Sequence, residues 1–363
     1  MLEFSYEGRH CLQEVLGAGR LLQAEGFEQP SWTALAEGAR PEQPDPSELD
    51  PGEWRHGWQY FASTAREVYH LEHKVKPRCS EPELSLLRSQ SGRNCARGLT
   101  AVPSDPALIL RPAKLNTVLC RRLRLPVLQL GSHCEGCGKR LDCFGDHRCA
   151  CMKSGRVQAR AKPVELAWAR VFREAGKEEG ATVRWQHMLR HTTLPVDPED
   201  NRRVDVLVEG LPLYSGRPLF CDTTLRSPLK GDGTPHPRAA RKDGAVLERA
   251  LQNKERKDGD VARSELAELV VLACEVGGRW HETAVELVRQ LAKLKVRNVH
   301  PLLRRSVQLA WSDRWWSLLG VAVQDALAGS LLAPNGKKLV LDRADAETPE
   351  LDLLLDGQRW ALE

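Results

Sequence analysis

The feature that most constrains this chain is a short run of cysteines that contains one histidine. Cys134 and Cys137 have two residues between them, His147 follows after nine more, and Cys151 after a further three. Two thiols at this spacing in a tight turn can face one ion, and the glycines on either side of Cys137 ease such a turn. The pattern C-x2-C-x9-H-x3-C therefore predicts a closed, structural zinc site whose binding energy contributes to folding.

Two further cysteines leave the last ligand of this site open. Cys143 and Cys149 are spare thiols in the same segment, and either can replace Cys151 in the pattern. Five of the eleven cysteines crowd into residues 134 to 151, which favours a metal over a disulfide framework. The alternative is a set of reduced cysteines in an ordinary turn, which predicts no stoichiometric zinc in the purified protein.

Charge is distributed unevenly along the chain, although the net charge is only +4. Residues 1 to 80 carry eight basic and thirteen acidic side chains, whereas residues 110 to 170 carry thirteen basic and four acidic ones. A basic segment attracts polyanions through counterion release. Residues 110 to 170 therefore indicate a nucleic-acid partner, and an ordinary solvated surface is the alternative.

The sequence shows no sign of secretion or of a membrane span. Glu3 and Glu7 stand where a signal peptide has its basic segment. The longest apolar run, over 317–333, is interrupted by Gln324 and Asp325, and it falls short of the roughly 18 uninterrupted apolar residues of a membrane helix. We therefore expect an intracellular protein.

Composition and spacing divide the chain of 363 residues into six segments. Five prolines among acids in residues 27 to 53 predict a linker without regular structure inside the first segment. The six segments are an acidic N-terminal region over 1–80, a helical linker over 81–132, the cysteine segment over 133–152, an α/β core over 153–280, a helical region over 281–335 and a tail over 336–363.

The α/β core is predicted from the alternation of helical and strand-like patterns. The expected elements are a helix over 164–175, strands over 182–189, 204–208 and 218–225, a helix over 239–256 and a strand over 266–276. Two more helices are expected beyond the core, over 283–295 and 301–332. In the last one Trp311, Trp315 and Trp316 mark a packing face. The expected order gives a small sheet flanked by helices.

Two of the expected strands carry a carboxylate among apolar residues. Asp205 lies within Val204 to Val208, and Asp222 lies within Leu219 to Leu225. A charge buried in a strand is costly without a counter-ion or a metal. If the two strands pair with both acids on one face, they offer hard oxygen ligands of the kind that Mg²⁺ prefers.

Cleavage of a phosphodiester would need a cation in addition to the metal, because negative charge develops on the phosphate. Lys254 and Lys257 on the following helix are candidates for that cation. Glu165, on the helix before the strands, is a candidate third acid that orients water or the metal. Each of these residues, taken alone, also fits an ordinary structural acid or a solvated surface.

The order of these motifs resembles the C-terminal region of non-LTR retrotransposon proteins that carry a restriction-like endonuclease of the PD-(D/E)XK superfamily. In that family a CCHC zinc knuckle precedes the nuclease, the nuclease nicks target DNA, and an upstream reverse transcriptase uses the freed 3′ hydroxyl as primer. The resemblance spans residues 82 to 332. Its motifs are Cys134-x2-Cys137 with Phe144-Gly145-Asp146-His147 and Cys151, Arg203-x-Asp205, Cys221-Asp222-Thr223-Thr224-Leu225-x-Ser227-Pro228, Lys254-Glu255-Arg256-Lys257 and Cys274-Glu275-Val276-Gly277-Gly278-Arg279-Trp280.

The resemblance implies a mixed sheet flanked by helices, with a zinc knuckle over 133–152 and a restriction-like endonuclease core over 153–280. It implies DNA as the partner, with RNA as a second candidate, and a nuclear location. Magnesium is the implied catalytic metal and zinc the structural one.

For the site residues, the resemblance implies that Asp205 and Asp222 hold magnesium and that Glu165 is the helix acid. Lys254 is the implied catalytic lysine, and Lys257 is the alternative. Three features depart from the family pattern: Val204 replaces the usual proline, Thr224 occupies the usual lysine position, and Gly176 to Gly180 has the pattern of a small insertion. Related nucleases take the lysine from the helix instead.

Three functions are compatible with the sequence. The first is a metal-dependent nickase, the second is a catalytically inactive zinc-knuckle protein that binds nucleic acid, and the third is a scaffold that uses its helical C-terminal region. The chain has no Tyr/Phe-x-Asp-Asp segment of a polymerase palm, so we expect a fragment, a domesticated remnant or a gene model cut from a decayed element. It also lacks the phosphate-binding loop of NTPases, the G-x-S-x-G elbow of hydrolases and the H-E-x-x-H helix of zinc proteases.

Overall fold

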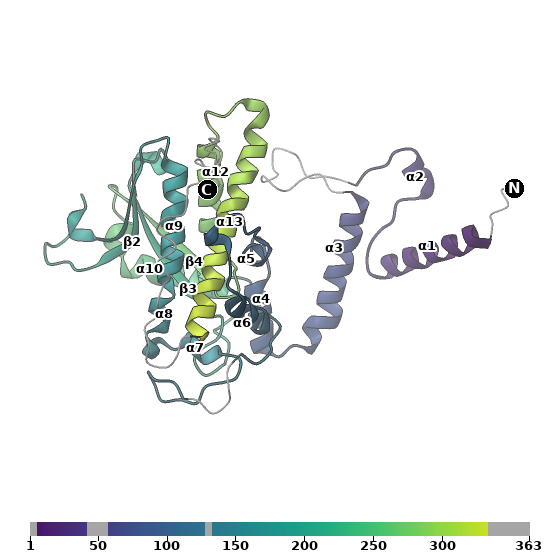
Figure 1. Cartoon of the computed structure of the whole chain (residues 1–363), viewed down its shortest axis with the longest axis horizontal. Helices are drawn as coiled ribbons and strands as arrows, with labels where there is room; N and C mark the ends of the chain where they lie inside the picture. The colour runs from purple at the N-terminus through teal and green to yellow at the C-terminus, as the bar shows by residue number, and fades with distance from the viewer. Residues whose placement is uncertain (1–5, 42–56, 128–132, 333–363) are drawn as a thin grey trace, which may run out of the picture. The chain divides into compact units, whose positions relative to one another are not determined.

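The computed structural model describes residues 6–41, 57–127 and 133–332. The chain forms two compact units, Met1–Ser80 and Glu81–Glu363, and each is considered by itself (Figure 1). The tail expected over 336–363 and residues 42–53 of the proline-rich linker lie outside the described residues.

The described part of the first unit contains three α-helices. They are α1 (Tyr6–Ala24), α2 (Trp32–Ala36) and α3 (Trp58–His70), and α3 continues as a π-helical turn and a short 3-10 turn that ends at Arg78. The short helix α2 corrects the expectation that 27–53 has no regular structure. It forms because Ser31 caps its first turn by accepting a hydrogen bond from the Ala34 N–H.

The second unit combines ten α-helices and four strands in its described part. Its helices are α4 (Glu81–Gln90), α5 (Arg97–Thr100), α6 (Pro112–Arg122), α7 (Asp146–Ala150), α8 (Arg156–Ala159), α9 (Ala161–Gly176), α10 (Ala245–Lys257), α11 (Gly259–Ala262), α12 (Glu282–Lys295) and α13 (Pro301–Leu332). Its strands are β1 (Thr182–Met188), β2 (Arg203–Glu209), β3 (Leu219–Arg226) and β4 (Glu268–Glu275). The expected mixed α/β class is thus confirmed.

One expected boundary in this unit was wrong. The helix predicted over 239–256 begins only at Ala245. The residues before it form turns, and Gly244 has a φ of 68°, so the backbone enters the left-handed region just before the helix. Apolar spacing does not detect such a turn, because Ala239 is buried like a helical core residue.

The four strands form one mixed sheet in the order β1-β2-β3-β4. The pairs β1–β2 and β2–β3 are antiparallel, whereas β3 and β4 are parallel and are connected through α10 and α11. A parallel pair needs such a crossover, and the antiparallel pairs do not. β2 pairs with β1 over Arg203 to Glu209 but with β3 only over Val206 to Val208, so the sheet opens between β2 and β3 at one end.

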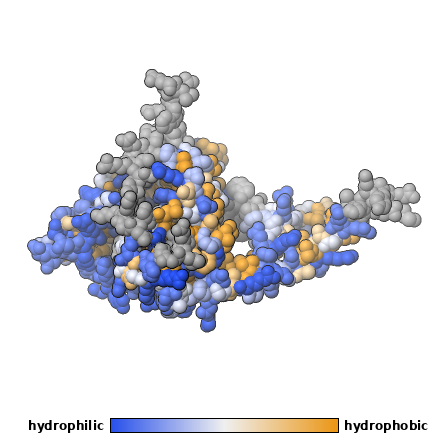
Figure 2. Space-filling view, turned by 60° about the horizontal axis from the view of Figure 1, so that its bottom comes forward, coloured by the Kyte–Doolittle hydropathy of each residue, from blue (hydrophilic) through white to orange (hydrophobic). Residues whose placement is uncertain are grey.

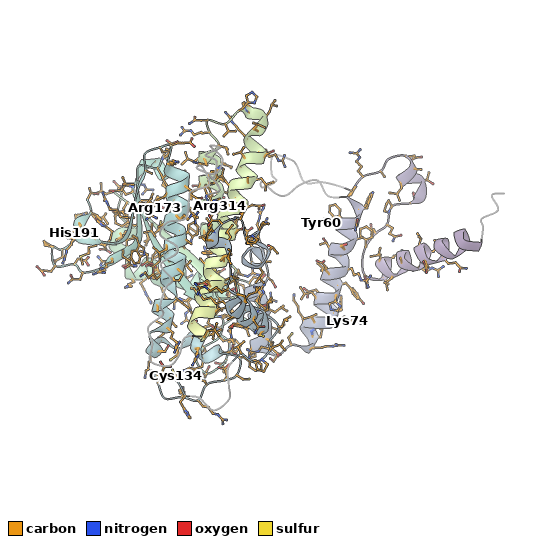
Figure 3. All side chains as sticks on the ribbon, viewed as in Figure 1. Tyr60, Lys74, Cys134, Arg173, His191 and Arg314 are labelled. Carbon is orange, nitrogen blue, oxygen red and sulfur yellow. The ribbon has the colours of Figure 1, made fainter. Side chains whose placement is uncertain are left out.

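Helices cover both faces of the sheet. Alternate strand residues, such as Val206, Cys221 and Leu272, pack into the main core with α9, α12 and α13. The intervening residues face the other way, where Val271 of β4 packs against Leu247 of α10. This alternation follows from the two-residue period of a strand. At the outer end, beyond the sheet, the connection between β1 and β2 carries the exposed His191 (Figure 3), and the surface there is mostly hydrophilic (Figure 2).

The long helix α13 lies in the middle of the second unit (Figure 1). It packs against α5, α6, α9 and α12, and the three tryptophans expected on its packing face are all buried. Within the described residues it is the one helix long and apolar enough to cross a membrane, but 78% of that apolar window is buried inside the protein. It is therefore a core helix of this unit.

A network of charges fixes α13 to α9. Glu174 of α9 is fully buried and accepts hydrogen bonds from Arg314 and Trp315 of α13 and from Arg170. Asp105 also pairs with Arg170 and Arg314, at 2.7 and 3.1 Å. Buried charges are tolerated only when they are paired in this way. Arg314 lies on α13 next to α9 in Figure 3.

Much of the charge in the basic segment 110–170 contributes to the fold. Eight of its thirteen basic side chains are buried or partly buried, among them Arg121, Arg148, Arg156 and Arg160. Several donate to backbone carbonyls of distant elements, as Arg156 does to Ser330 at 3.0 Å. Much of this charge therefore holds the fold together and does not face solvent.

Candidate functional site

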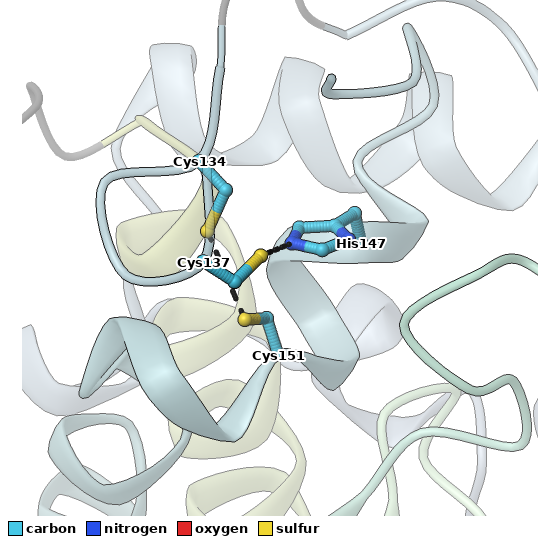
Figure 4. A group of neighbouring side chains, drawn as sticks. All are labelled: Cys134, Cys137, His147 and Cys151. Atoms are coloured by element: carbon cyan, nitrogen blue, oxygen red, sulfur yellow. Dashed lines mark hydrogen bonds between the residues drawn. The ribbon is translucent and has the colours of Figure 1, made fainter. Parts of the chain in front are cut away.

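The first candidate site is the cysteine and histidine cluster. The side chains of Cys134, Cys137, His147 and Cys151 converge on one point, and their ligand atoms all lie within 4.8 Å of one another (Figure 4). The backbone arranges the first two thiols: the Cys134 N–H donates to Lys139 O and the Gly138 N–H donates to Cys134 O, both at 2.8 Å. His147 lies on α7, and Cys151 directly follows that helix.

Two distances between ligand atoms are close to those around a tetrahedral zinc ion. The sulfurs of Cys134 and Cys151 are 3.7 Å apart, and Cys137 Sγ is 3.2 Å from His147 Nε2. Ligands at about 2.3 Å (sulfur) and about 2.0 Å (nitrogen) from one tetrahedral ion lie about 3.5 to 3.8 Å from each other. A hydrogen bond from the Lys139 backbone lowers the pKa of the Cys137 thiol, which favours the thiolate that a metal needs. The cluster can therefore hold a metal such as zinc.

The structure also decides between the three candidate cysteines for the last ligand position. Cys149 is fully buried in the main hydrophobic core. Burial raises the pKa of the Cys149 thiol, as expected for a structural cysteine. Cys143 does not belong to the cluster, whereas Cys151 does. The pattern that we preferred from the sequence is therefore the one that the fold brings together.

The tautomer of His147 is fixed by a contact from another part of the chain. Its Nδ1 lies 2.6 Å from the carbonyl oxygen of Gly231, in the connection between β3 and α10. A carbonyl can only accept, so Nδ1 carries the proton and Nε2 is left to face the sulfurs. Metal-binding histidines are commonly oriented through their second nitrogen in this way.

Charged side chains secure the cluster to the rest of the unit. Asp142 caps α7 by accepting from the Asp146 and His147 N–H groups at 2.9 and 2.8 Å. Arg121 and Arg124 both pair with Asp146, at 3.0 and 2.7 Å. The segment is thus packed into the second unit.

The second candidate site lies where the sheet opens between β2 and β3. Asp205 and Asp222 stand one position beyond the last paired residues, Val206 and Cys221, so they lie at the same end of the ladder. The Thr223 N–H does not extend this ladder; it donates to Asp205 Oδ2 at 2.7 Å. The carboxylate of Asp205 therefore lies against β3, in the opening next to Asp222.

Glu165 reaches the same place from α9. It is only 6% exposed, and its Oε2 accepts hydrogen bonds from Trp185 Nε1 at 2.9 Å and from Gln186 Nε2 at 2.8 Å. Gln186 Nε2 also donates to Asp205 Oδ1 at 3.2 Å. One amide thus joins a helix acid to a strand acid that is forty residues away in sequence.

Of the two candidate lysines, Lys254 of α10 reaches the acids. Its Nζ forms an ion pair with Asp222 Oδ2. Lys257 lies one helical turn further and is exposed, and within the described part of the chain it forms no ion pair or hydrogen bond with these acids. The structure therefore brings Glu165, Asp205, Asp222 and Lys254 together and leaves Lys257 at the margin.

The electrostatics of this site are those of crowded, partly desolvated acids. Burial, together with the charges of Asp222 and Glu165, raises the pKa of Asp205 to about 7. Burial also raises the pKa of Asp222, against the lowering effect of Lys254. Asp222 Oδ1 is buried and has no hydrogen-bond partner among the described residues. A buried, unpartnered carboxylate oxygen beside two further acids is a donor set that suits a hard cation.

The acids are nevertheless less tightly gathered than the cysteine cluster. Within the described residues, only the cysteine and histidine group has three or more ligand atoms so close together. Gln186 joins the carboxylates of Glu165 and Asp205, the Thr223 N–H holds Asp205 against β3, and Asp222 pairs with Lys254.

No protein-family model matches the chain, and no curated protein matches it.

Two residues of the acidic site were not found from the sequence. Trp185 and Gln186 lie on β1, which was expected only as a strand. The one available signal was a polar glutamine between Trp185 and His187 in a short strand. Their contacts depend on the pairing of β1 with β2 and on the approach of α9, which local spacing does not encode.

Proposed function

We propose that the protein is a metal-dependent DNA endonuclease that nicks one strand and leaves a 3′ hydroxyl. The observation that carries this proposal is the convergence of Glu165, Asp205 and Asp222 with Lys254 at the open end of the β2–β3 ladder. These four residues come from two helices and two strands, and the chain between Glu165 and Lys254 contains three strands and the connections between them.

The order of elements supports a restriction-like fold of the PD-(D/E)XK type. A helix that carries an acid is followed by three strands, a helix with a short further turn of helix, and a strand parallel to the third, which is the sequence α9, β1, β2, β3, α10, α11, β4. Thr224 stands in the position of the usual lysine, and the Lys254 ion pair with Asp222 supports a lysine supplied from the helix.

Glu165, Asp205 and Asp222 would hold Mg²⁺, which supplies Lewis-acid polarisation of the scissile phosphate and a bound water of lowered pKa. The Lys254 ammonium would stabilise the negative charge that develops on the phosphate oxygens. Without a metal, burial and its acidic neighbours raise the pKa of Asp205 to about 7, so binding of Mg²⁺ near neutral pH would displace a proton from this site. Hydrolysis then breaks the bond between phosphorus and the 3′ oxygen, which leaves as the hydroxyl.

The proposal extends to the class of protein. A zinc knuckle directly before such a core supports the resemblance to non-LTR retrotransposon proteins, with zinc as a structural ion, DNA or RNA as partner and the nucleus as location. The zinc segment would then contribute to the grip on nucleic acid, helped by exposed basic residues such as Lys139, Arg140 and Lys153.

The test is relaxation of supercoiled plasmid by the purified, zinc-loaded full chain in Mg²⁺. Asp205→Asn and Asp222→Asn are expected to abolish nicking, and Glu165→Gln is expected to reduce it strongly. Glu265→Gln, an exposed glutamate between α11 and β4, is the matched control and is expected to nick like the wild type. Binding to labelled DNA, measured by fluorescence anisotropy, is expected to persist in all four variants.

The outcomes separate the three functions. Plasmid that stays supercoiled over a range of metals and salts, with DNA binding that weakens as salt rises, would support the inactive nucleic-acid-binding protein. Absence of both binding and cleavage would support a scaffold.

A further inference from the structure

The backbone of β1 is distorted at a single residue of the acidic site. Gln186 has a φ of 52°, in the left-handed region that a residue with a side chain seldom adopts inside a strand. Its neighbours pair normally, Trp185 with Val206 and His187 with Val204, so the distortion does not come from the end of the strand. Backbone strain of this kind persists only where surrounding contacts enforce it, and it often marks functional sites.

The distortion accompanies a contact between two acids that come from different elements. Asp205 lies where β2 changes its packing, because Val204 packs with Leu207 and Phe220 whereas Val206 packs into the main core. Glu165 lies on α9, which covers the main core. The Gln186 side chain nevertheless reaches both carboxylates, at 2.8 Å from Glu165 and 3.2 Å from Asp205.

The direction of these hydrogen bonds follows from chemistry. Both partners are carboxylate oxygens, which only accept while ionised, and the amide nitrogen has two hydrogens to donate. Gln186 Nε2 therefore offers one hydrogen to each acid. It acts between the two acids as a weak substitute for a positive charge, because it draws together two carboxylates that repel each other.

We propose that Gln186 is a positioning residue, which holds the carboxylates of Glu165 and Asp205 side by side before a divalent cation binds. This inference rests on the proposed function and deepens it, because it assigns the preorganisation of the metal site to a residue that does not itself bind the metal. Trp185 assists from the next position by donating to the same oxygen of Glu165. Side chains that orient metal ligands typically change metal affinity by about 10- to 100-fold when they are replaced.

Gln186→Gly gives the sharpest test, because glycine removes the amide and also relieves the left-handed strain. Without Mg²⁺, the melting temperature of this variant is expected to equal or exceed that of the wild type. With Mg²⁺, the concentration that gives half of the maximal thermal stabilisation is expected to rise by about 10-fold or more. If Gln186 were only structural, its replacement would instead lower the melting temperature and leave the Mg²⁺ dependence unchanged.

Two further variants test the role of Gln186 in Mg²⁺ binding. Gln186→Asn keeps an amide and tolerates the left-handed region, but its side chain is one methylene shorter, so it is also expected to weaken Mg²⁺ binding. Arg184→Ala is the control on the same strand, since its exposed side chain pairs with Glu209 at 2.8 Å, and it is expected to bind Mg²⁺ like the wild type. Calorimetric titration of the zinc-loaded full chain with MgCl₂ provides the affinities without any DNA present.

The outcomes keep this inference distinct from the proposed function. If the wild type shows no stabilisation and no heat of binding with Mg²⁺, both are overturned. If the wild type binds Mg²⁺ and Gln186→Gly binds it within twofold, only the role of Gln186 is overturned. Tighter Mg²⁺ binding by Gln186→Gly would also overturn it, since the amide would then compete with the cation.

Discussion

The stability of the second unit should depend on pH through Glu275, at the end of β4. Its side chain is buried at 3% exposure, and burial raises its pKa to about 7, although the charge of Arg279 acts in the opposite direction. Asp243, which pairs with Arg279 at 3.1 Å, adds to the upward shift. The perturbation that isolates this group is Glu275→Gln, which keeps the shape and removes the ionisable proton.

The sign of the effect follows from proton linkage. Glu275 has a pKa of about 7 in the folded chain and 4.5 as its ordinary value, so the folded state binds more protons between these two pH values. Its stabilising contribution is complete below pH 4.5 and is lost as the pH rises through 7. A shift of this size corresponds to about 3 kcal/mol, of which about 2.5 kcal/mol is lost between pH 5 and pH 8.

The assay is urea unfolding followed by tryptophan fluorescence, with both proteins zinc-loaded, from pH 5 to pH 8. The free energy of unfolding of the wild type is expected to fall by about 2.5 kcal/mol relative to that of Glu275→Gln over this range. All other titrating groups are shared, so their contributions cancel in the difference. A difference in the free energy of unfolding between the two proteins that stays constant with pH would refute the reasoning. A difference that changes in favour of the wild type as the pH rises would refute it as well.

Four other replacements test the packing and the metal cluster. Cys151→Ser is expected to lose stoichiometric zinc, whereas Cys149→Ser is expected to retain it, as measured by metal analysis of purified protein. Gly98→Ala is expected to destabilise the chain by about 1 to 3 kcal/mol in urea unfolding, because the new Cβ would lie 2.4 Å from the carbonyl oxygen of Gly320. Glu174→Ala is expected to cost about 3 to 5 kcal/mol in the same assay, because it removes a fully buried carboxylate that accepts hydrogen bonds from Arg170, Arg314 and Trp315.

The parts of the fold that follow local rules could be predicted from the sequence. The ends of β2 and β3 lie within one residue of the predicted ends. Such strands can be predicted because a run of apolar residues bounded by turn residues indicates a buried strand. The cysteine cluster was also predicted from local spacing, because the two residues between Cys134 and Cys137 fit a single tight turn. Its fourth ligand was harder, because Cys149 and Cys151 are two residues apart and only the packing of α7 shows which one is in the core.

Long-range contacts could not be predicted in this way. Arg148 and Arg156 look like part of a nucleic-acid-binding segment, yet they donate to the carbonyls of Leu331 and Ser330, at the C-terminal end of α13. Cations are favoured there by the helix dipole and by the unpaired carbonyls of the last turn. Their use depends on a helix that ends more than 170 residues later, and net charge along the sequence carries no information about it.

The cysteine cluster and the acidic site share one segment of the chain. The connection between β3 and α10 begins just after the strand that carries Asp222 and ends at the helix that carries Lys254. His147 Nδ1 donates to Gly231 O within this connection, which is folded into a turn by the pairing of Lys230 with Thr234. A metal on His147 Nε2 would fix the imidazole and, through Nδ1, the connection that spans the two site residues. The cysteine segment is thus better understood as a support of the acidic site than as a separable module.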